Sequence, residues 1–265
     1  MKTLVARLTC LCISLIVVSL CFTDLGSAKI DPKSIMGVWL LDEGRGDIAT
    51  DSSGNKNDGK IVGAKWTDGK FGKALEFDGS SHVEILASKT TDDIMNGFTY
   101  LIWVKPTAAP PNVNTRVIER DWHNPTIQIG STDFYGSIAV NGDQANTNIR
   151  GGTWKMGNWS FVAITHDGAV LKLYVNGEMV NSKNIGKPDA KPNATTPPNQ
   201  GAIWLATWKA PGWDFKGVLD EAGVFNTPLS DTDLKDIMNN GLEKLAPVYS
   251  IGKMAIAWGA VKNMK

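Results

Sequence analysis

Three tryptophans stand among turn-forming residues, and their surroundings suit the recognition of a sugar. Trp122 lies two residues after Arg120, while Trp208 and Trp213 flank a Lys-Ala-Pro-Gly segment. An exposed indole ring can stack on the apolar C–H face of a pyranose while polar neighbours bind its hydroxyl groups. Trp122, Arg120, Trp208 and Trp213 are therefore candidate ligand-binding residues. The alternative is that these rings pack over the bases of their own loops.

One acid, Asp220, lies inside an otherwise apolar run of the sequence. Val218 and Leu219 precede it, and Ala222 and Val224 follow. A buried carboxylate costs free energy unless it is paired or bound to a metal ion. Asp220 is thus a candidate metal ligand; pairing with Lys or Arg, or the capping of a turn, are the alternatives.

The sequence lacks several common catalytic patterns. His82, His123 and His166 are too far apart to indicate a zinc pair, and no His-x-x-x-His occurs. There is no Gly-x-Ser-x-Gly elbow, Walker loop or Rossmann glycine pattern either. These absences argue against enzymes of those classes.

Composition excludes further classes of protein. The 265 residues include 27 Lys+Arg and 27 Asp+Glu, and 42% are hydrophobic. Such a balanced chain is neither a strongly basic nucleic-acid binder nor a disordered segment. Its 27 Gly and 12 Pro favour many short strands and turns over long helices.

Residues 1–28 have the layout of a secretory signal peptide. Lys2 and Arg7 form a basic start, an apolar stretch runs from Leu8 to Phe22, and Gly26-Ser27-Ala28 offers small residues for cleavage. A membrane anchor is the alternative, but the stretch is short for one. We expect cleavage before Lys29, a secreted or cell-surface protein, and no membrane span after cleavage.

All cysteines, at positions 10, 12 and 21, lie in that leader. Lipidation of Cys21 would need a small residue before it, and Leu20 stands there. The mature chain therefore has no disulfide and no thiolate metal site. Its stability must come from burial, with a bound ion as a further source.

Strand signals recur along the mature chain. Residues 98–105 form an aromatic and β-branched run ended by Pro106, which is typical of a central strand. Residues 160–166 and 170–175 are separated by Asp167-Gly168, and Asn176-Gly177 follows them. These pairs predict type I′ turns and hence an antiparallel meander. The tryptophans in strand-like contexts, which we predict to be core residues, are Trp39, Trp66, Trp103, Trp159 and Trp204.

One helix is indicated between Ser230 and Gly241. Ser230 suits the N-cap, two acids follow in the first turn, and Gly241 can close the end. Leu234, Ile237 and Met238 would share a face that packs on the edge of the sandwich.

Several short segments occur in an informative order. They are Gly37–Gly46, Asp51–Gly59, Lys70–Gly79, Phe98–Val104, Gly157–Ala163, Tyr174–Gly177 and Gly217–Asn226. The ordered set resembles the laminin-G-like, concanavalin A-like jelly-roll domains of secreted bacterial proteins. The resemblance implies an all-β fold of two antiparallel sheets packed face to face, one of them concave, with one short C-terminal helix. We therefore expect a signal peptide at 1–28, a laminin-G-like domain at 29–243 and a C-terminal extension at 244–265.

The resemblance also implies a structural Ca²⁺ at the sandwich edge. Relatives on this fold join the first strand, an early loop and the last strand through hard oxygen ligands. The corresponding candidates are Asp42, Asp78 and Asp220, together with backbone carbonyls. The loop Asp51–Gly59 looks superficially like an EF-hand, but it lacks the closing Glu, so we predict a polar turn-rich loop there.

Catalytic relatives on this fold carry Glu-x-Asp-x-Glu or Gln-x-His on one strand. Here Glu76-Phe77-Asp78-Gly79-Ser80 lacks the last acid, and Gln128-Ile129-Gly130 lacks the histidine. We therefore expect a non-enzymatic recognition module that binds carbohydrate in the manner of a lectin. Its partner would be a glycan or an extracellular protein surface, and not nucleic acid. The alternatives are a protein or matrix adhesion module, and a glycoside hydrolase or polysaccharide lyase with an unrecognised site.

Overall fold

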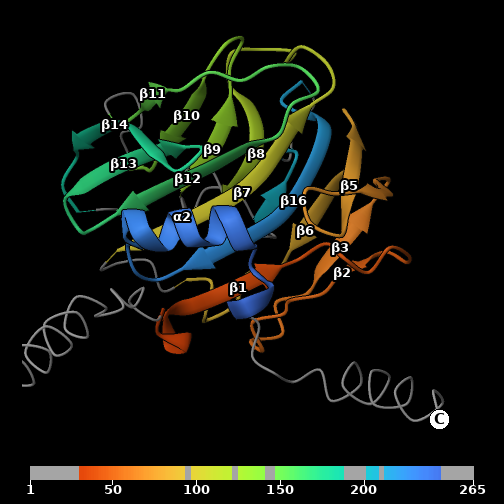
Figure 1. Ribbon diagram of the computed structural model, residues 1–265, viewed down its shortest axis with the longest axis horizontal. Coiled ribbons are helices and arrows are strands. Elements are labelled where there is room, and N and C mark those ends of the chain that lie inside the picture. Colours follow the sequence, from red (N-terminus) through yellow and green to blue (C-terminus); the bar gives the residue numbers. More distant parts are fainter. Residues whose placement is uncertain are drawn as a thin grey trace, which may run out of the picture.

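The computed structural model describes residues 30–92, 97–120, 125–140, 147–187, 201–208 and 212–245. Figure 1 shows two antiparallel sheets packed face to face and one short α-helix, so the predicted all-β sandwich is confirmed. The predicted signal peptide, Trp122, His123 and residues 246–265 of the predicted extension lie outside the described residues. Among the described residues, no helix has the length and apolar character needed to cross a membrane.

Each sheet contains eight strands in the described part of the chain. Sheet A has the order β14 (Glu178–Asn184), β13 (Val170–Val175), β12 (Ser160–His166), β7 (Phe98–Pro106), β16 (Lys216–Phe225), β5 (Lys73–Asp78) and β4 (Lys65–Asp68), and β1 (Ile35–Trp39) also pairs with β16. Sheet B has the order β11 (Ile149–Gly151), β10 (Phe134–Ser137), β9 (Thr126–Ile129), β8 (Thr115–Arg120), β15 (Ile203–Leu205), β6 (His82–Ile85), β3 (Gly59–Val62) and β2 (Ile48–Ala49). The helical elements are η1 (Pro32–Ser34), α2 (Asp231–Asn240) and η2 (Glu243–Leu245).

Strand alternation gathers apolar side chains from both sheets in one shared core. Tyr100 and Ile102 of β7 enter it from sheet A, and Ile127 of β9 enters it from sheet B; all three are 0% exposed. Val117 and Ile118 are neighbours in sequence, yet both face this core. They can do so because the register of β8 against β9 shifts between Arg116 and Ile118. The two sheets are therefore held together by burial of their inner faces.

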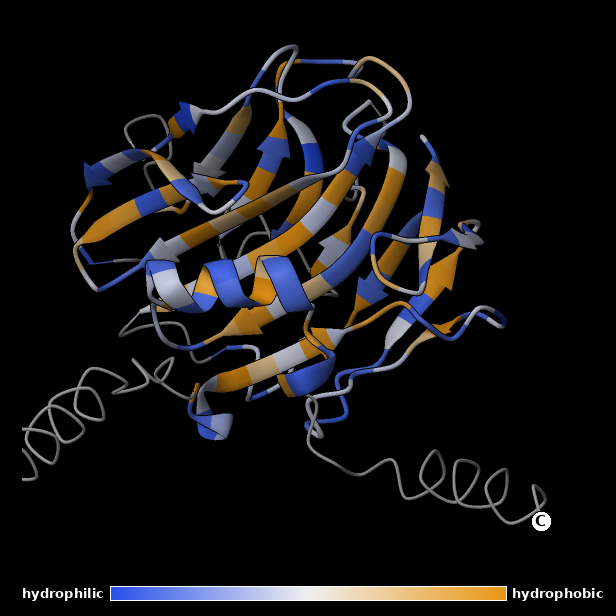
Figure 2. Ribbon diagram, in the orientation of Figure 1, coloured by the Kyte–Doolittle hydropathy of each residue, from blue (hydrophilic) through white to orange (hydrophobic). Residues whose placement is uncertain are grey.

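A second apolar cluster covers the outer face of sheet A. Leu101 of β7 and Phe161 of β12 pack with Leu234 and Ile237 of α2. Figure 1 shows α2 lying across these strands, and Figure 2 shows apolar bands alternating along them. The helix therefore packs on the face of sheet A, and not on the edge that the sequence suggested.

The predicted helix is confirmed together with its cap. Ser230 Oγ accepts a hydrogen bond from the Asp233 amide at 3.1 Å, and Asp233 Oδ2 accepts one from the Ser230 amide at 3.2 Å. This reciprocal pair is a capping box. Gly241 ends the helix with a φ of 77°.

Both predicted hairpins are present, and one turn differs from the prediction. Asn176 and Gly177 have φ values of 52° and 78° and turn β13 into β14, as a type I′ turn requires. Between β12 and β13 the positive φ belongs to Gly168 and not to Asp167. The Asp167 carboxylate instead accepts hydrogen bonds from the amides of Ala169 and Val170, so a side-chain-stabilised turn forms there.

Strand β16 pairs with three strands and changes partner along one edge. It pairs with β7 on one side; on the other it pairs with β5 as far as Leu219 and with β1 from Ala222 onward. Asp220 and Glu221 lie at the change, where the register shifts and Glu221 has a φ of 45°. A bulge carrying two acids thus interrupts the central strand of sheet A.

The loop from Asp51 to Gly59 folds back against β1 through buried hydrogen bonds. Asp51 is 6% exposed, and its carboxylate accepts from the amides of Val38, Ser53 and Asn57 at 2.9–3.0 Å. The Trp39 indole donates to the Asn57 carbonyl at 2.8 Å. The Asp51 carboxylate is therefore occupied by backbone donors, as expected of a turn-rich loop.

Replacing Asp51 with Ala should strongly destabilise the fold, because three amide donors lose their acceptor. A buried donor without a partner costs about 1–3 kcal/mol, so we expect urea unfolding to show a loss of about 3 kcal/mol or more. Asp47→Ala removes an exposed carboxylate from the same region and is the matched control. Equal losses in the two variants would contradict this structural role.

His166 is a buried, neutral imidazole on β12. It is 0% exposed and stacks on Phe98 with ring centroids 5.5 Å apart. Its Nδ1 accepts from the Gly168 amide at 3.1 Å, which leaves Nε2 to donate to the Gly186 carbonyl at 3.0 Å. Burial lowers the pKa of His166 below its usual 6.5, while the hydrogen bond to the Gly186 carbonyl and the charge of Asp167 oppose this shift.

The His166 pKa predicts an acid-sensitive contribution to stability. Because the folded-state pKa is depressed, the contribution is complete above pH 6.5 and is lost as pH falls through the folded pKa. Urea unfolding between pH 7 and pH 4 should show this loss in the natural protein and a smaller one in His166→Gln. The same pH slope in both proteins would contradict it.

Candidate functional site

The outer face of sheet B is polar, whereas the outer face of sheet A is apolar beneath α2. The residues on either side of Gln128 and Trp204 face the shared core, so these two side chains face outward. In register, Arg116 lies opposite Gln128, and Glu119 lies opposite Trp204. Polar and aromatic side chains thus run across β9, β8 and β15.

The charged groups on this face pair with one another. Arg116 Nε lies 3.1 Å from Glu119 Oε2, and Thr126 Oγ1 donates to the same oxygen at 2.5 Å. Gln128 Nε2 donates to Thr126 Oγ1 at 3.3 Å. Arg116 is 2% exposed and Glu119 is 0% exposed. This network fixes the side chains of β8 and β9 in one arrangement.

Trp213 lies over the guanidinium of Arg116. Arg116 Cζ is 4.8 Å from the centroid of the Trp213 ring, a cation–π distance, and the Arg116 amide donates to the Trp213 carbonyl at 2.9 Å. Trp208 and Trp213 are both half-buried and lie between β15 and β16. A hydrogen bond from Thr207 Oγ1 to Asp214 Oδ1 joins the two ends of this connection.

Trp204 and His82 continue the aromatic surface toward β6. Their ring centroids are 5.4 Å apart and their planes meet at 52°. Burial lowers the pKa of His82, while the charges of Glu84 and Asp214 oppose that shift. We call the set Trp204, Trp208, Trp213, His82 and Asp214 the tryptophan surface. Trp204 is 7% exposed, and the other four residues are half-exposed.

Of the four predicted ligand-binding residues, two belong to this surface. These two are Trp208 and Trp213. Trp122 lies outside the described residues. Arg120 is opposite Ile203 in register and therefore faces the interior; it is 2% exposed and paired with Asp92. Arg120 has a structural partner and does not enter the tryptophan surface.

Sequence reasoning missed the rest of this surface. Trp204 is buried, as predicted, but it faces away from the shared core, and Arg116, His82 and Asp214 were not proposed. Alternation gives the available signal, because Ile203 and Leu205 face inward and Trp204 must then face outward.

Two half-exposed carboxylates, Glu84 and Asp214, lie near His82 at the tryptophan surface. Glu84 and Glu119 flank Trp204 in register, but Glu119 is fully buried in its ion pair with Arg116. Glu76 and Asp78, the near match to a hydrolase motif, lie on β5 in sheet A. A glycosidase needs two acids that both reach the substrate.

Two of the three predicted metal ligands converge on one loop. Asp220 Oδ2 accepts from the amides of Lys70 and Phe71 at 2.7 and 3.0 Å. Asp42 Oδ1 accepts from the amide of Lys73 at 2.6 Å. The two carboxylates therefore hold the turn between β4 and β5 from both ends.

The third predicted ligand, Asp78, lies elsewhere. It pairs in register with Lys216, four residues before Asp220 on β16, which places it roughly 13 Å away along the strand. Its Oδ1 accepts from the amides of Ser80 and Ser81. These turn contacts, with the register, separate Asp78 from the other two acids.

Asp220 has the features of an incomplete cation site. It is 0% exposed, and its Oδ1 has no hydrogen-bond partner. Burial, together with the charge of Asp42, raises the pKa of Asp220 to about 7. Burial, together with the charges of Asp220 and Asp42, raises the pKa of Glu221 to about 8. No group of three or more His, Cys, Asp or Glu residues suited to a metal occurs among the described residues. A Ca²⁺ there would need carbonyl or water oxygens to reach six to eight ligands.

Comparison with known proteins identifies the family. The two-sheet sandwich is that of the concanavalin A-like lectins and glucanases, and the sequence profile described as "Concanavalin A-like lectin/glucanases superfamily" matches residues 77–235. The chain belongs to this superfamily, within its laminin G group. The resemblance drawn from the ordered segments is thereby confirmed.

Several solved domains share this fold. Domain 4 of AbnA, a GH43 extracellular arabinanase from Geobacillus stearothermophilus solved with arabinotriose, matches with a TM-score of 0.56 and 22% identity, over 81% of this chain and 98% of that one. The binding domain of Paraclostridial Mosquitocidal Protein 1 matches with a TM-score of 0.62 and 14% identity, over 80% and 54%. The binding domain of Botulinum neurotoxin DC, solved with SialylT, matches with a TM-score of 0.58 and 13% identity, over 79% and 52%.

The chain thus spans nearly all of the arabinanase domain and about half of each toxin domain. At these identities the likeness shows the fold. None of the curated protein sequences matches this chain.

Proposed function

We propose that this protein is a secreted, non-catalytic module that binds oligosaccharide at the tryptophan surface. The half-exposed Trp213 ring, fixed over Arg116 beside a polar sheet face, carries the proposal. A sugar ring stacks on an indole through its C–H groups, and the neighbouring His82 and Asp214 supply hydrogen-bonding groups for its hydroxyls. The arabinotriose complex of the AbnA domain and the SialylT complex of the neurotoxin domain support this ligand class.

The absence of catalysis is part of the proposal. Glu119 is buried in an ion pair with Arg116. Glu84 is therefore the half-exposed acid that lies opposite Trp204 in register. Asp214, the other half-exposed acid of this surface, already accepts hydrogen bonds from Thr207 Oγ1 and the Gly212 amide. We therefore assign Asp214 to hydroxyl binding, and not to the acid and base pair that glycoside hydrolysis uses. The similar toxin segments are described as binding domains, which agrees with recognition.

We also propose that Asp42 and Asp220 hold a structural Ca²⁺. The partnerless Oδ1 of Asp220 and the convergence of both acids on one loop support it. The ion would neutralise two carboxylates that otherwise repel each other and favour their ionised forms. Its role would be to fix the loop between β4 and β5 against β16.

Replacing Trp213 with Ala should weaken oligosaccharide binding at least tenfold, about 1.4 kcal/mol, because the stacking platform is lost. A glycan array selects the oligosaccharide, and calorimetric titration then measures its Kd. Trp159→Ala is the matched control, since Trp159 is half-buried on sheet A and also carries a cation, Lys105 Nζ, 4.8 Å from its ring.

The control should bind as the natural protein does. Equal weakening by both substitutions, or full binding by Trp213→Ala, would refute the tryptophan surface as the site. Release of shorter fragments from the bound oligosaccharide would refute the non-catalytic proposal. Binding to an extracellular protein with no binding on the array would favour the adhesion alternative.

Chelation should lower the melting temperature of the protein, because a ligand that binds only the folded state stabilises it. Saturation at 100 times Kd contributes about 2.7 kcal/mol. Asp220→Asn should abolish the response to Ca²⁺, while Asp78→Asn should retain it. An unchanged melting curve after exhaustive chelation would refute the proposed Ca²⁺ site.

A further inference from the structure

The outer face of sheet B continues past the tryptophan surface over three further strands. Glu84 of β6 lies opposite Trp204 in register. Lys60 of β3 lies opposite Glu84, and Ile48 of β2 lies opposite Lys60. Residues paired in this way have Cβ atoms about 4.5–5.5 Å apart. A continuous row of side chains therefore leads from Trp204 to the edge of the sheet at β2, which Figure 1 shows beside β3.

The far end of this row exposes aliphatic side chains. Ala49 and Ile61 face the shared core, so their neighbours on β2 and β3 face outward. Of these neighbours, Ile48 is 46% exposed and Val62 is 37% exposed, and the Lys60 side chain is exposed as well. We call Ile48, Lys60 and Val62 the β2–β3 surface. It offers two aliphatic groups beside one ammonium.

A second cross-strand contact joins the β2–β3 surface to the tryptophan surface. Val62 lies opposite His82 in register, and the centroid of the His82 ring is 5.4 Å from that of Trp204. Ile48 and Val62 are diagonal neighbours, because Ile48 pairs with Lys60, two residues before Val62. The two surfaces are therefore contiguous, and a molecule bound at one can extend to the other along the same sheet face.

The charges along this row favour a neutral ligand. Lys60 faces Glu84 across the ladder, so the two opposite charges offset each other. A carboxylate or sulfate group would be attracted to Lys60 and repelled by Glu84. A hydroxyl group can accept a hydrogen bond from the Lys60 ammonium without carrying a charge. Ile48 and Val62 then suit the apolar C–H groups of the same sugar ring.

The length of the row matches a short chain of sugars. Three strand spacings separate β15 from β2, and at about 4.8 Å each they span about 14 Å. A sugar unit in an extended chain advances by roughly one strand spacing, so a chain of about four units reaches from Trp204 to Ile48.

We propose that the β2–β3 surface is a second subsite for the oligosaccharide, and that the ligand is a linear, neutral chain. One sugar stacks at the tryptophan surface, and the chain then crosses β6 and β3. A later unit packs on Ile48 and Val62 and accepts a hydrogen bond from Lys60. This inference rests on the proposed function and adds to it the direction and the length of the ligand.

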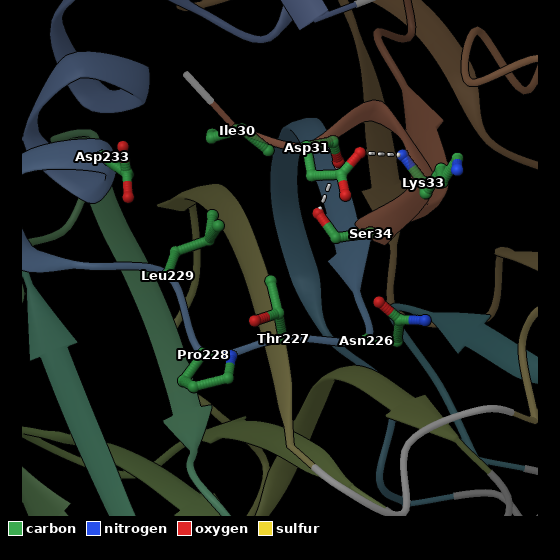
Figure 3. A pocket seen from close by; sticks show the side chains of 9 residues that line it. All are labelled: Ile30, Asp31, Lys33, Ser34, Asn226, Thr227, Pro228, Leu229 and Asp233. Carbon is green, nitrogen blue, oxygen red and sulfur yellow. Dashed lines mark hydrogen bonds between the residues drawn. The ribbon is translucent and has the colours of Figure 1, made fainter. Parts of the chain in front are cut away.

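A pocket elsewhere on the molecule provides the comparison. It has a volume of about 510 Å³ and lies between the start of the described chain and the connection from β16 to α2 (Figure 3). Ile30 and Leu229 are among its lining residues, and none of them belongs to the tryptophan surface or to the β2–β3 surface. An NMR signal from Ile30 therefore reports binding in the pocket, and one from Ile48 reports binding at the second subsite.

The test is calorimetric titration of the purified protein with arabinose oligosaccharides of two to six units, and with the xylose and cellulose series of the same lengths. In at least one series the affinity should rise at least tenfold from two units to four and change less than twofold from four to six. Full affinity at two units, binding to none of the three series, or tighter binding of oligogalacturonides would overturn the proposal. Binding of other glycans on the array would then leave the proposed function standing, whereas no glycan binding at all would refute both.

The double variant Ile48→Ser, Val62→Thr should weaken binding of the four-unit chain at least fivefold and leave the two-unit chain within twofold, because only the longer chain reaches the second subsite. Met179→Ser is the matched control, since Met179 is a 50% exposed aliphatic residue on β14 of sheet A. Trp213→Ala should weaken both lengths, which distinguishes loss of the tryptophan surface from loss of the second subsite.

Methyl NMR of the natural protein gives a readout that needs no substitution. The Ile48 signal should shift with the four-unit chain and not with the two-unit chain, and the Ile30 signal should shift with neither. A shift at Ile30 without one at Ile48 would place the chain in the pocket and overturn the proposal. Equal weakening of both chain lengths by the double variant would do the same.

Discussion

The change of partner along β16 is the constraint on which sheet A depends. A strand has two edges, and β16 must pair with β7 on one and with both β5 and β1 on the other. At the change, Asp220 accepts hydrogen bonds from two amides of the loop after β4. Glu221 accepts one from the amide of Leu242, beyond α2. The buried acids thus replace ladder hydrogen bonds with side-chain ones, at the cost of raised carboxyl pKa values. The proposed Ca²⁺ site is a consequence of this bulge.

Among the described residues, a helix covers the outer face of sheet A and none covers that of sheet B, and the two faces differ for this reason. On sheet A, α2 buries an apolar face and makes it part of the structure. On sheet B, the outward side chains of β8, β9 and β15 are polar or aromatic, and they satisfy one another through Arg116 and Glu119. A rigid polar network beneath an aromatic ring is suited to present that ring to a ligand in a fixed orientation.

Residues close together in sequence were enough to predict the helix and the turns. The positions of the candidate site residues depend instead on the register between paired strands. The helix after Ser230 and the turn at Asn176-Gly177 depend on residues close in sequence, and both form as predicted. Asp78 and Asp220 belong to paired strands, but their separation is fixed by a register that one sequence does not reveal. The inward direction of Arg120 follows from the bulge in β8, which composition and spacing do not disclose.

The pairing of β1 with β16 has a consequence for how the protein is made. Ile35 lies opposite Phe225, so β1 cannot complete its pairing until β16, the last strand of the described residues, has been made. Contacts this distant in sequence slow the search for the native topology, and open strand edges invite aggregation meanwhile. Until the ribosome has released β16, the strands β1, β5 and β7 lack the partner strand that they share. Closure of sheet A around β16 therefore comes late in synthesis, once residues 216–225 have left the ribosome.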